Sequence, residues 1–186
     1  MRRPREHESA AAKYTYLRGL TMLPLGALLI LAALANAEVG PSWAFPVAVA
    51  AGAAVWLWIA RYYGERYGRI SPSSRQQLRA TLAALLAVAV MAGGSVLLKD
   101  APVNAIAVPF AVVMLIAYAI GMGLAPHHVV VWGGLVLAGT IWTGDNEGLV
   151  LMGVAVIVNG VLDHRQLVRR FGSPGLLRLE DGDVGA

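Results

Sequence analysis

Six long stretches of the chain contain no Asp, Glu, Lys or Arg, and this pattern constrains the fold more than any other feature. A helix needs about 20 mostly apolar residues to cross roughly 30 Å of hydrocarbon. Backbone polar groups in lipid must be hydrogen-bonded within the chain, so each stretch is expected to be helical. We therefore predict an all-α fold, a polytopic membrane bundle of six transmembrane helices. The stretches are approximately 19–37, 43–60, 80–98, 104–124, 127–143 and 148–162.

Composition agrees with a chain that lies mostly in lipid. Hydrophobic residues make up 58% and charged residues 14%, whereas a soluble domain has about 25% charged residues. Such a composition excludes a disordered chain, and the absence of cysteine excludes a disulfide scaffold and a cysteine-ligated metal site. The spans leave no room for a soluble domain. We predict one transmembrane domain over residues 1–172 and a short flexible cytoplasmic tail over 173–186.

The distribution of basic residues predicts the orientation. In a six-span arrangement, all of the 15 Lys and Arg residues except Lys99 lie on one side of the membrane. Basic residues concentrate in the cytoplasmic loops of membrane proteins. Both termini are therefore predicted to be cytoplasmic, in a multi-pass protein of the cell (cytoplasmic) membrane. The same residues face anionic lipid headgroups, so the sequence pI near 9.8 requires no nucleic-acid partner.

The first stretch has a second interpretation. It follows a basic arm and ends in Ala35-Asn36-Ala37, which is the small-x-small pattern of a signal-peptide cleavage site. The arm is long and the apolar stretch is at the upper limit for a signal peptide. We therefore expect the segment to be retained as the first span, with cleavage before Glu38 as the alternative.

A basic and aromatic motif occurs twice where a span enters the cytoplasm. Arg61-x-x-x-x-Arg66-Tyr67-Gly68 matches Arg165-x-x-x-x-Arg170-Phe171-Gly172. The match is compatible with a duplication, but basic and aromatic residues are also ordinary at a cytoplasmic helix exit. We interpret these residues either as an interaction surface or as anchors that hold helices at the interface. The set is Arg61, Tyr63, Arg66, Tyr67, Arg165, Arg170 and Phe171.

Histidines give the most specific chemical hypothesis. His127 and His128 lie in a short predicted cytoplasmic turn, and Asp163 and His164 lie at the cytoplasmic end of the sixth stretch. Imidazoles with a carboxylate are a common ligand set for a transition metal. The alternative is that these histidines are solvated or cap helices, because adjacent side chains do not easily point in one direction. We predict no metal and no other cofactor, and keep these four residues as weak candidates.

Few polar side chains lie inside the predicted spans. Asn159 is an intramembrane amide, which is more often a hydrogen-bonding contact between helices than a substrate ligand. The absence of Asp, Glu, Lys and Arg from all six stretches argues against a proton-driven or sodium-driven pump. Small residues four apart allow close helix packing. These pairs are Ala48 and Gly52, Ala89 and Gly93, and Gly134 and Ala138.

The end of the sixth stretch resembles a known group of proteins. The segment Asp163-His164-Arg165-Gln166-Leu167-Val168-Arg169 is similar to helix exits in uncharacterised small polytopic bacterial membrane proteins. The bias toward Ala, Gly and Arg also resembles that of proteins from GC-rich bacterial genomes. The resemblance covers about a dozen residues. It implies the same six-helix placement and no activity.

No nucleophile elbow, phosphate-binding loop, dinucleotide fingerprint or His-Glu-x-x-His motif occurs in the sequence. We therefore predict a non-enzymatic accessory or scaffold subunit that acts through helix–helix and lipid contacts. Its partners would be membrane lipids and either another membrane protein or further copies of itself. The alternative is a transporter or channel subunit for a neutral or apolar small molecule. A metal-dependent membrane enzyme is a third interpretation, which rests on the histidines alone.

Overall fold

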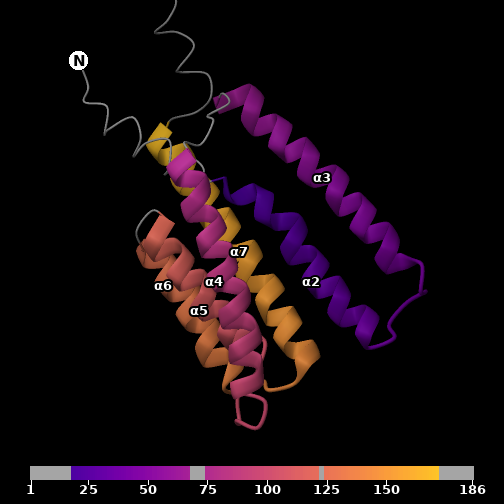
Figure 1. Ribbon diagram of the computed structural model, residues 1–186. Helices are drawn as coiled ribbons and strands as arrows, with labels where there is room; N and C mark the ends of the chain where they lie inside the picture. The colour runs from indigo at the N-terminus through magenta and orange to yellow at the C-terminus, as the bar shows by residue number, and fades with distance from the viewer. Residues whose placement is uncertain (1–17, 68–73, 122–123, 172–186) are drawn as a thin grey trace, which may run out of the picture.

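The computed structural model describes residues 18–67, 74–121 and 124–171. Within these ranges it contains six α-helices, one short 3-10 helix and no strand. The predicted all-α fold is therefore confirmed. The elements are η1 (Gly19–Met22), α2 (Leu23–Asn36), α3 (Ala44–Tyr67), α4 (Ser74–Leu97), α5 (Ala107–Gly121), α6 (Pro126–Gly139) and α7 (Asp145–Phe171), as Figure 1 shows.

Three helical segments are long and apolar enough to cross a membrane. They are Gly19–Asn36, Ala44–Arg66 and Asp145–Arg169, and they correspond to the first, second and sixth predicted stretches. The helices α5 and α6 have 15 and 14 residues. At 1.5 Å per residue they are about 21–23 Å long, which is shorter than the roughly 30 Å of hydrocarbon. The count of six spans remains a prediction.

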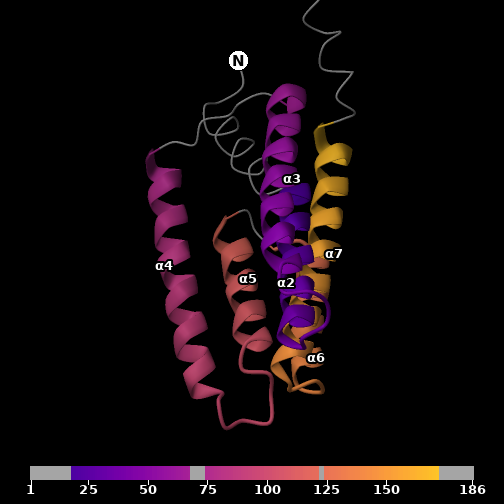
Figure 2. The ribbon, with the colours of Figure 1, turned by 90° about the vertical axis from the view of Figure 1, so that its right-hand side faces the viewer.

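Consecutive helices run in opposite directions, and α7 lies in the middle of the bundle (Figure 1). The helix α7 packs against α2 on one side and α6 on the other, and α5 packs against α6. The helix α3 packs against α2 at one edge of the bundle (Figure 1), and α4 packs against α5 at another edge (Figure 2). Because six α-helices alternate in direction, Gly19 and Phe171 lie at the same end of the molecule.

Glycines allow α7 to approach the first helical segment backbone to backbone. A Cβ added at Gly153 would lie 2.6 Å from the carbonyl oxygen of Gly26, and one at Gly160 would lie 2.6 Å from that of Gly19. The small pairs predicted from sequence differ from one another. A Cβ added at Gly52 of α3 would lie 3.2 Å from Cδ1 of Leu28, so Gly52 lies at the contact between α3 and α2. A Cβ at Gly93 or Gly134 would meet no atom within 4 Å, so these two glycines do not mediate packing within the chain.

The helix α5 begins three residues later than the fourth predicted stretch because Asn104 caps it. The side-chain Oδ1 of Asn104 accepts hydrogen bonds from the backbone N–H groups of Ile106, at 3.1 Å, and Ala107, at 2.7 Å. Its Nδ2 donates to the carbonyl oxygen of Gly144, also at 2.7 Å. Asn104 is fully buried, so this one side chain connects the start of α5 to the turn before α7.

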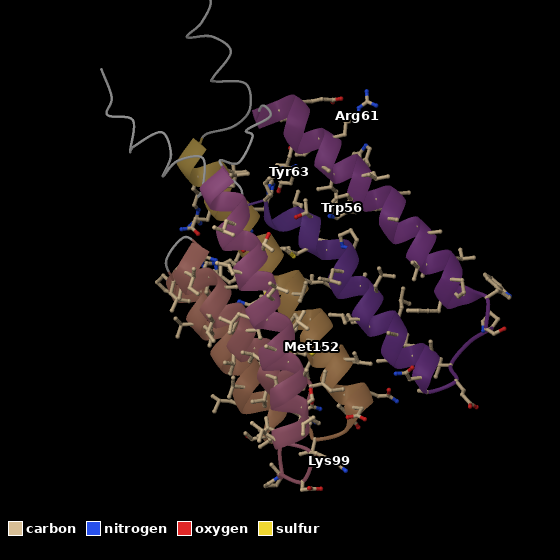
Figure 3. The ribbon with its side chains drawn as sticks, viewed as in Figure 1. Trp56, Arg61, Tyr63, Lys99 and Met152 are labelled. Atoms are coloured by element: carbon tan, nitrogen blue, oxygen red, sulfur yellow. The ribbon has the colours of Figure 1, made fainter. Side chains whose placement is uncertain are left out.

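The main apolar core lies between α5, α6 and α7. It contains Ala107, Ala111, Tyr118, Trp132, Leu135, Met152, Ala155 and Val156. A second, smaller core joins α3 to α7 through Ile59, Tyr63 and Leu167. Arg61 and Lys99 lie outside these cores, at the periphery and at opposite ends of the molecule, as Figure 3 shows.

Candidate functional site

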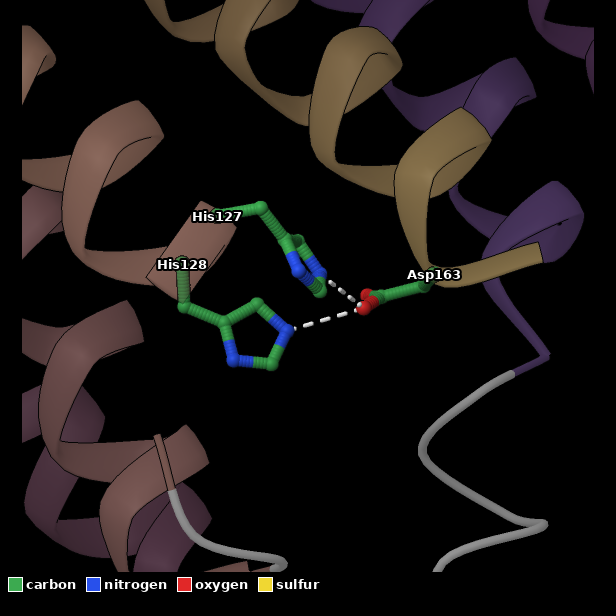
Figure 4. Close-up of side chains that lie close together, drawn as sticks. All are labelled: His127, His128 and Asp163. Atoms are coloured by element: carbon green, nitrogen blue, oxygen red, sulfur yellow. Dashed lines mark hydrogen bonds and ion pairs between the residues drawn. The ribbon is translucent and has the colours of Figure 1, made fainter. Parts of the chain in front are cut away.

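A fully buried carboxylate, Asp163, is the centre of a polar cluster between three helices. Its Oδ1 lies 2.9 Å from Nε2 of His127 and 2.8 Å from Nε2 of His128, as Figure 4 shows. Its Oδ2 accepts a hydrogen bond from the hydroxyl of Tyr118 at 2.7 Å and one from Nδ2 of Asn159 at 2.8 Å. The two oxygens therefore have separate sets of partners.

The start of α6 explains how two adjacent histidines reach one oxygen. Pro126 is at the first helical position, so His127 and His128 lie in the first turn. Helical side chains tilt toward the N-terminus of their helix, and both rings extend past this end toward Asp163. The ring centroids are 4.1 Å apart. The expectation that the adjacent side chains do not easily point in one direction is therefore wrong.

The hydrogen bonds assign the tautomer of His128. The backbone N–H of Ala125 donates to Nδ1 of His128 at 3.1 Å, so this nitrogen carries the lone pair. The hydrogen then lies on Nε2, which donates to Asp163. The Tyr118 ring stacks on this imidazole with centroids 3.8 Å apart. His128 thus both caps α6 and binds the carboxylate.

His127 is the member of the cluster that is closest to solvent. Its side chain is 20% exposed, whereas the side chains of His128 and Asp163 are fully buried. Among the described residues, the ion-pair partners of Asp163 are these two histidines. Its charge is therefore balanced through an imidazole, or through a cation that the imidazoles also bind.

Asn159 connects α7 to α5. Its Nδ2 donates to the hydroxyl oxygen of Tyr118 at 2.6 Å as well as to Asp163, one turn further along the same helix. Its Oδ1 is buried and has no partner among the described residues. These contacts are those of the interhelical hydrogen bonding that the sequence suggested for this amide.

His164 lies outside the cluster, although it is next to Asp163 in sequence. Its Nδ1 is 2.8 Å from the hydroxyl oxygen of Tyr63 on α3. Tyr63 is fully buried beside Leu167, and the Arg18 guanidinium lies 5.2 Å from its ring centroid. Tyr63 was expected on an interaction surface or as an interfacial anchor. It is instead an interior contact that joins α3 to α7.

The other residues of the predicted basic and aromatic set have different environments. Arg61 is exposed and forms a 2.7 Å ion pair with Glu65, and the Arg66 guanidinium lies 5.6 Å from the Tyr62 ring centroid. Arg165 is exposed on α7. The helices include three further members whose side chains lie outside the described part of the structure. They are Tyr67, Arg170 and Phe171.

The sequence placed Asp163 just beyond the sixth stretch, and the structure places it inside the helix α7. The sixth stretch was ended at residue 162 because Asp163 is charged, but α7 continues to Phe171. The apolar segment Asp145–Arg169 therefore contains a buried ionisable residue. The prediction against a proton-driven or sodium-driven pump relied on charge-free stretches, so it does not take Asp163 into account. The sequence signal for this cluster was the spacing of Asn159 and Asp163, because residues four apart lie on the same face of a helix.

Comparison with protein-family models, curated protein sequences and solved structures finds no match to this chain. The function is therefore inferred from the geometry of this cluster and of the helices around it. His127, His128 and Asp163 each direct one potential ligand atom to a common point, and these atoms all lie within 4.8 Å of one another. This group has the chemistry to bind a proton or a metal ion.

Proposed function

We propose that the chain is a multi-pass protein of the cytoplasmic membrane with six spans and both termini in the cytoplasm. The three long apolar segments and the alternating helix directions support this arrangement. The short helices α5 and α6 then cross where their flanking turn residues add length or where the bilayer thins around them. The basic residues at the Arg61 end face the cytoplasm, and Lys99 faces the opposite side.

Within the membrane, the chain acts as a non-enzymatic accessory or scaffold subunit through helix–helix and lipid contacts. The observation that carries this proposal is the uncovered apolar face of α4. This helix packs on α5 alone among the pairs with substantial contact, while Leu85, Val88 and Val96 are 63%, 67% and 75% exposed. An apolar face this large needs lipid or another helix to cover it.

The two edge helices are proposed to have different surroundings. In α3, the exposed residues Trp56 and Trp58 lie near one end of the apolar segment, and Trp43 precedes the other end. Tryptophans at both ends are typical of a helix that faces lipid. The helix α4 contains no tryptophan. We assign α4 to contact with a helix of a partner or of a second copy, and no nucleic acid is involved.

Photo-crosslinking tests this assignment. A photoreactive amino acid replaces Leu85 in α4 or, as the matched variant, Leu57 in α3, which is 62% exposed. After irradiation of native membranes, the variant at Leu85 is expected to give a discrete protein adduct, and the variant at Leu57 is expected to give lipid adducts. The adduct mass distinguishes a second copy from another protein. Lipid adducts alone at both positions contradict a scaffold role for α4.

A second candidate function has an observation of its own. An apolar groove lies between α4 and α5 and is lined by Leu86, Val90, Val113, Ile116 and Ile120, among others. Such a surface suits a neutral or apolar solute, as in a transporter or channel subunit. Purified protein in liposomes would then increase the flux of apolar small molecules above that of empty liposomes. Equal flux excludes this candidate and leaves the scaffold proposal.

A further inference from the structure

We propose that His127, His128 and Asp163 form a binding site for a divalent transition metal ion of the Zn²⁺ class, which links α6 to α7. The site would use Nε2 of both histidines and Oδ1 of the carboxylate. Two imidazoles and one carboxylate are a ligand set that zinc sites use. The inference goes beyond the proposed function, because the site lies between α5, α6 and α7 and does not involve the uncovered face of α4.

The two oxygens of Asp163 contact different groups, and this arrangement supports a metal site. Both imidazole Nε2 atoms approach Oδ1, while Tyr118 and Asn159 donate to Oδ2. A carboxylate that ligates a metal is commonly oriented by hydrogen bonds of this kind. The carboxylate is thus already oriented by residues of α5 and α7.

The two contacts to the carboxylate require only a small adjustment. Ligand atoms around a tetrahedral zinc ion are about 3.4 Å apart, given metal–ligand bonds of about 2.1 Å. The two contacts to Oδ1 are 2.9 and 2.8 Å, so they would open by about half an ångström on metal binding. His127 is partly exposed and therefore provides the side from which an ion and a ligating water can enter.

One hydrogen bond has to change. A histidine that ligates through Nε2 carries its hydrogen on Nδ1, where His128 now accepts from the Ala125 N–H. Ala125 is the half-buried residue before α6, so its N–H can turn to water when His128 changes tautomer. The loss of one such hydrogen bond is small beside the free energy with which a zinc site holds its ion.

The burial of the Asp163 carboxylate also supports a metal site. Asp163 is fully buried, and among the described residues its ion-pair partners include no Lys or Arg. A buried carboxylate needs a positive partner, and a divalent cation held by the same two histidines supplies one. His164 has its Nδ1 on Tyr63 instead, so it serves as a natural control from the same helix.

The test measures zinc bound to the full chain. The protein is purified in mild detergent with a tag that lacks histidine, stripped with a chelator, incubated with excess ZnCl₂ and passed through a desalting column. Elemental analysis is expected to find one zinc ion per chain. Substitution by Co²⁺ is expected to give the visible absorption bands of a tetrahedral site. Stripped protein that takes up no stoichiometric zinc overturns the proposal, and this outcome needs no variant.

Variants then locate the ion. His127→Ala is expected to lose stoichiometric zinc and the cobalt bands, while His164→Ala keeps both. Tyr118→Phe removes only a hydrogen bond to the ligating carboxylate, so its zinc affinity is expected to fall about tenfold with the stoichiometry unchanged. Full zinc binding by His127→Ala, or its loss in His164→Ala alone, contradicts the assigned ligands. Neither result affects the crosslinking test of α4, so the two proposals fail separately.

Discussion

The hydroxyl oxygen of Tyr63 lies 2.8 Å from Nδ1 of His164, and this contact holds α3 against α7. The same hydroxyl accepts a longer contact, 3.4 Å, from the backbone N–H of Leu20. A single buried side chain thus connects α3, α7 and the short helix η1. The contact is important because α3 is otherwise an edge helix that packs mainly on α2.

Tyr63→Phe is expected to destabilise the folded protein by about 1 kcal/mol, because it removes this hydroxyl and leaves the His164 and Leu20 groups with fewer partners. The midpoint of thermal unfolding in detergent measures the effect. Tyr62→Phe is the matched control, since the Tyr62 ring stacks on Trp58 and its hydroxyl forms no hydrogen bond within the described chain. If Tyr63→Phe and Tyr62→Phe unfold at the same midpoint, the contact between Tyr63 and His164 does not stabilise the packing of α3 on α7.

The backbone approach between α2 and α7 gives a second prediction. In Gly153→Ala the new Cβ would lie 2.6 Å from the Gly26 carbonyl oxygen and 2.6 Å from Cγ1 of Ile30, so the helices must separate. We expect a loss of about 1–3 kcal/mol in stability, as for other overpacked cores. Unfolding midpoints in detergent would show it.

The control for this substitution lies in α6. Gly133→Ala meets no atom within 4 Å, and alanine favours a helix over glycine by up to about 1 kcal/mol. It is therefore expected to be neutral or stabilising. If Gly153→Ala is as stable as Gly133→Ala, the close packing of α2 on α7 is wrong.

The same packing bears on the cleavage pattern Ala35-Asn36-Ala37. The segment before it supplies Gly19 and Gly26, which lie against Gly160 and Gly153 of α7. Removal of this segment would uncover one face of α7, so we expect it to be retained. Intact-protein mass spectrometry of the purified chain decides the point. A mass that begins at Glu38 would show that the segment is a cleaved signal.

The helical fold was predictable because charge-free apolar stretches must become helices in lipid. The exact ends of helices were less accessible, since Asn104 begins α5 through side-chain hydrogen bonds that depend on a turn 40 residues away. Likewise, a single aspartate after an apolar stretch is interpreted from the sequence as the end of a membrane-spanning helix. Asp163 instead lies inside α7, where two histidines of α6 contact its carboxylate.

Glycine packing shows a similar limit. The sequence offers many small-residue pairs, and Gly134 was as plausible a packing site as Gly153. Only the fold shows that Gly153 faces the backbone of α2 while Gly134 faces open space. The sequence specified which residue types could contact one another, but partner choice depends on which helices are neighbours. For the same reason, His164 could not be separated from His127 and His128 before α3 was placed.

The most direct test of the account is the accessibility of single cysteines, because the chain contains none of its own. Arg61→Cys and Lys99→Cys place one thiol at each end of the molecule (Figure 3). A membrane-impermeant maleimide added to intact cells is expected to label Lys99→Cys and to label Arg61→Cys only after permeabilisation. Equal labelling of both positions in intact cells would contradict a membrane-spanning bundle with this orientation.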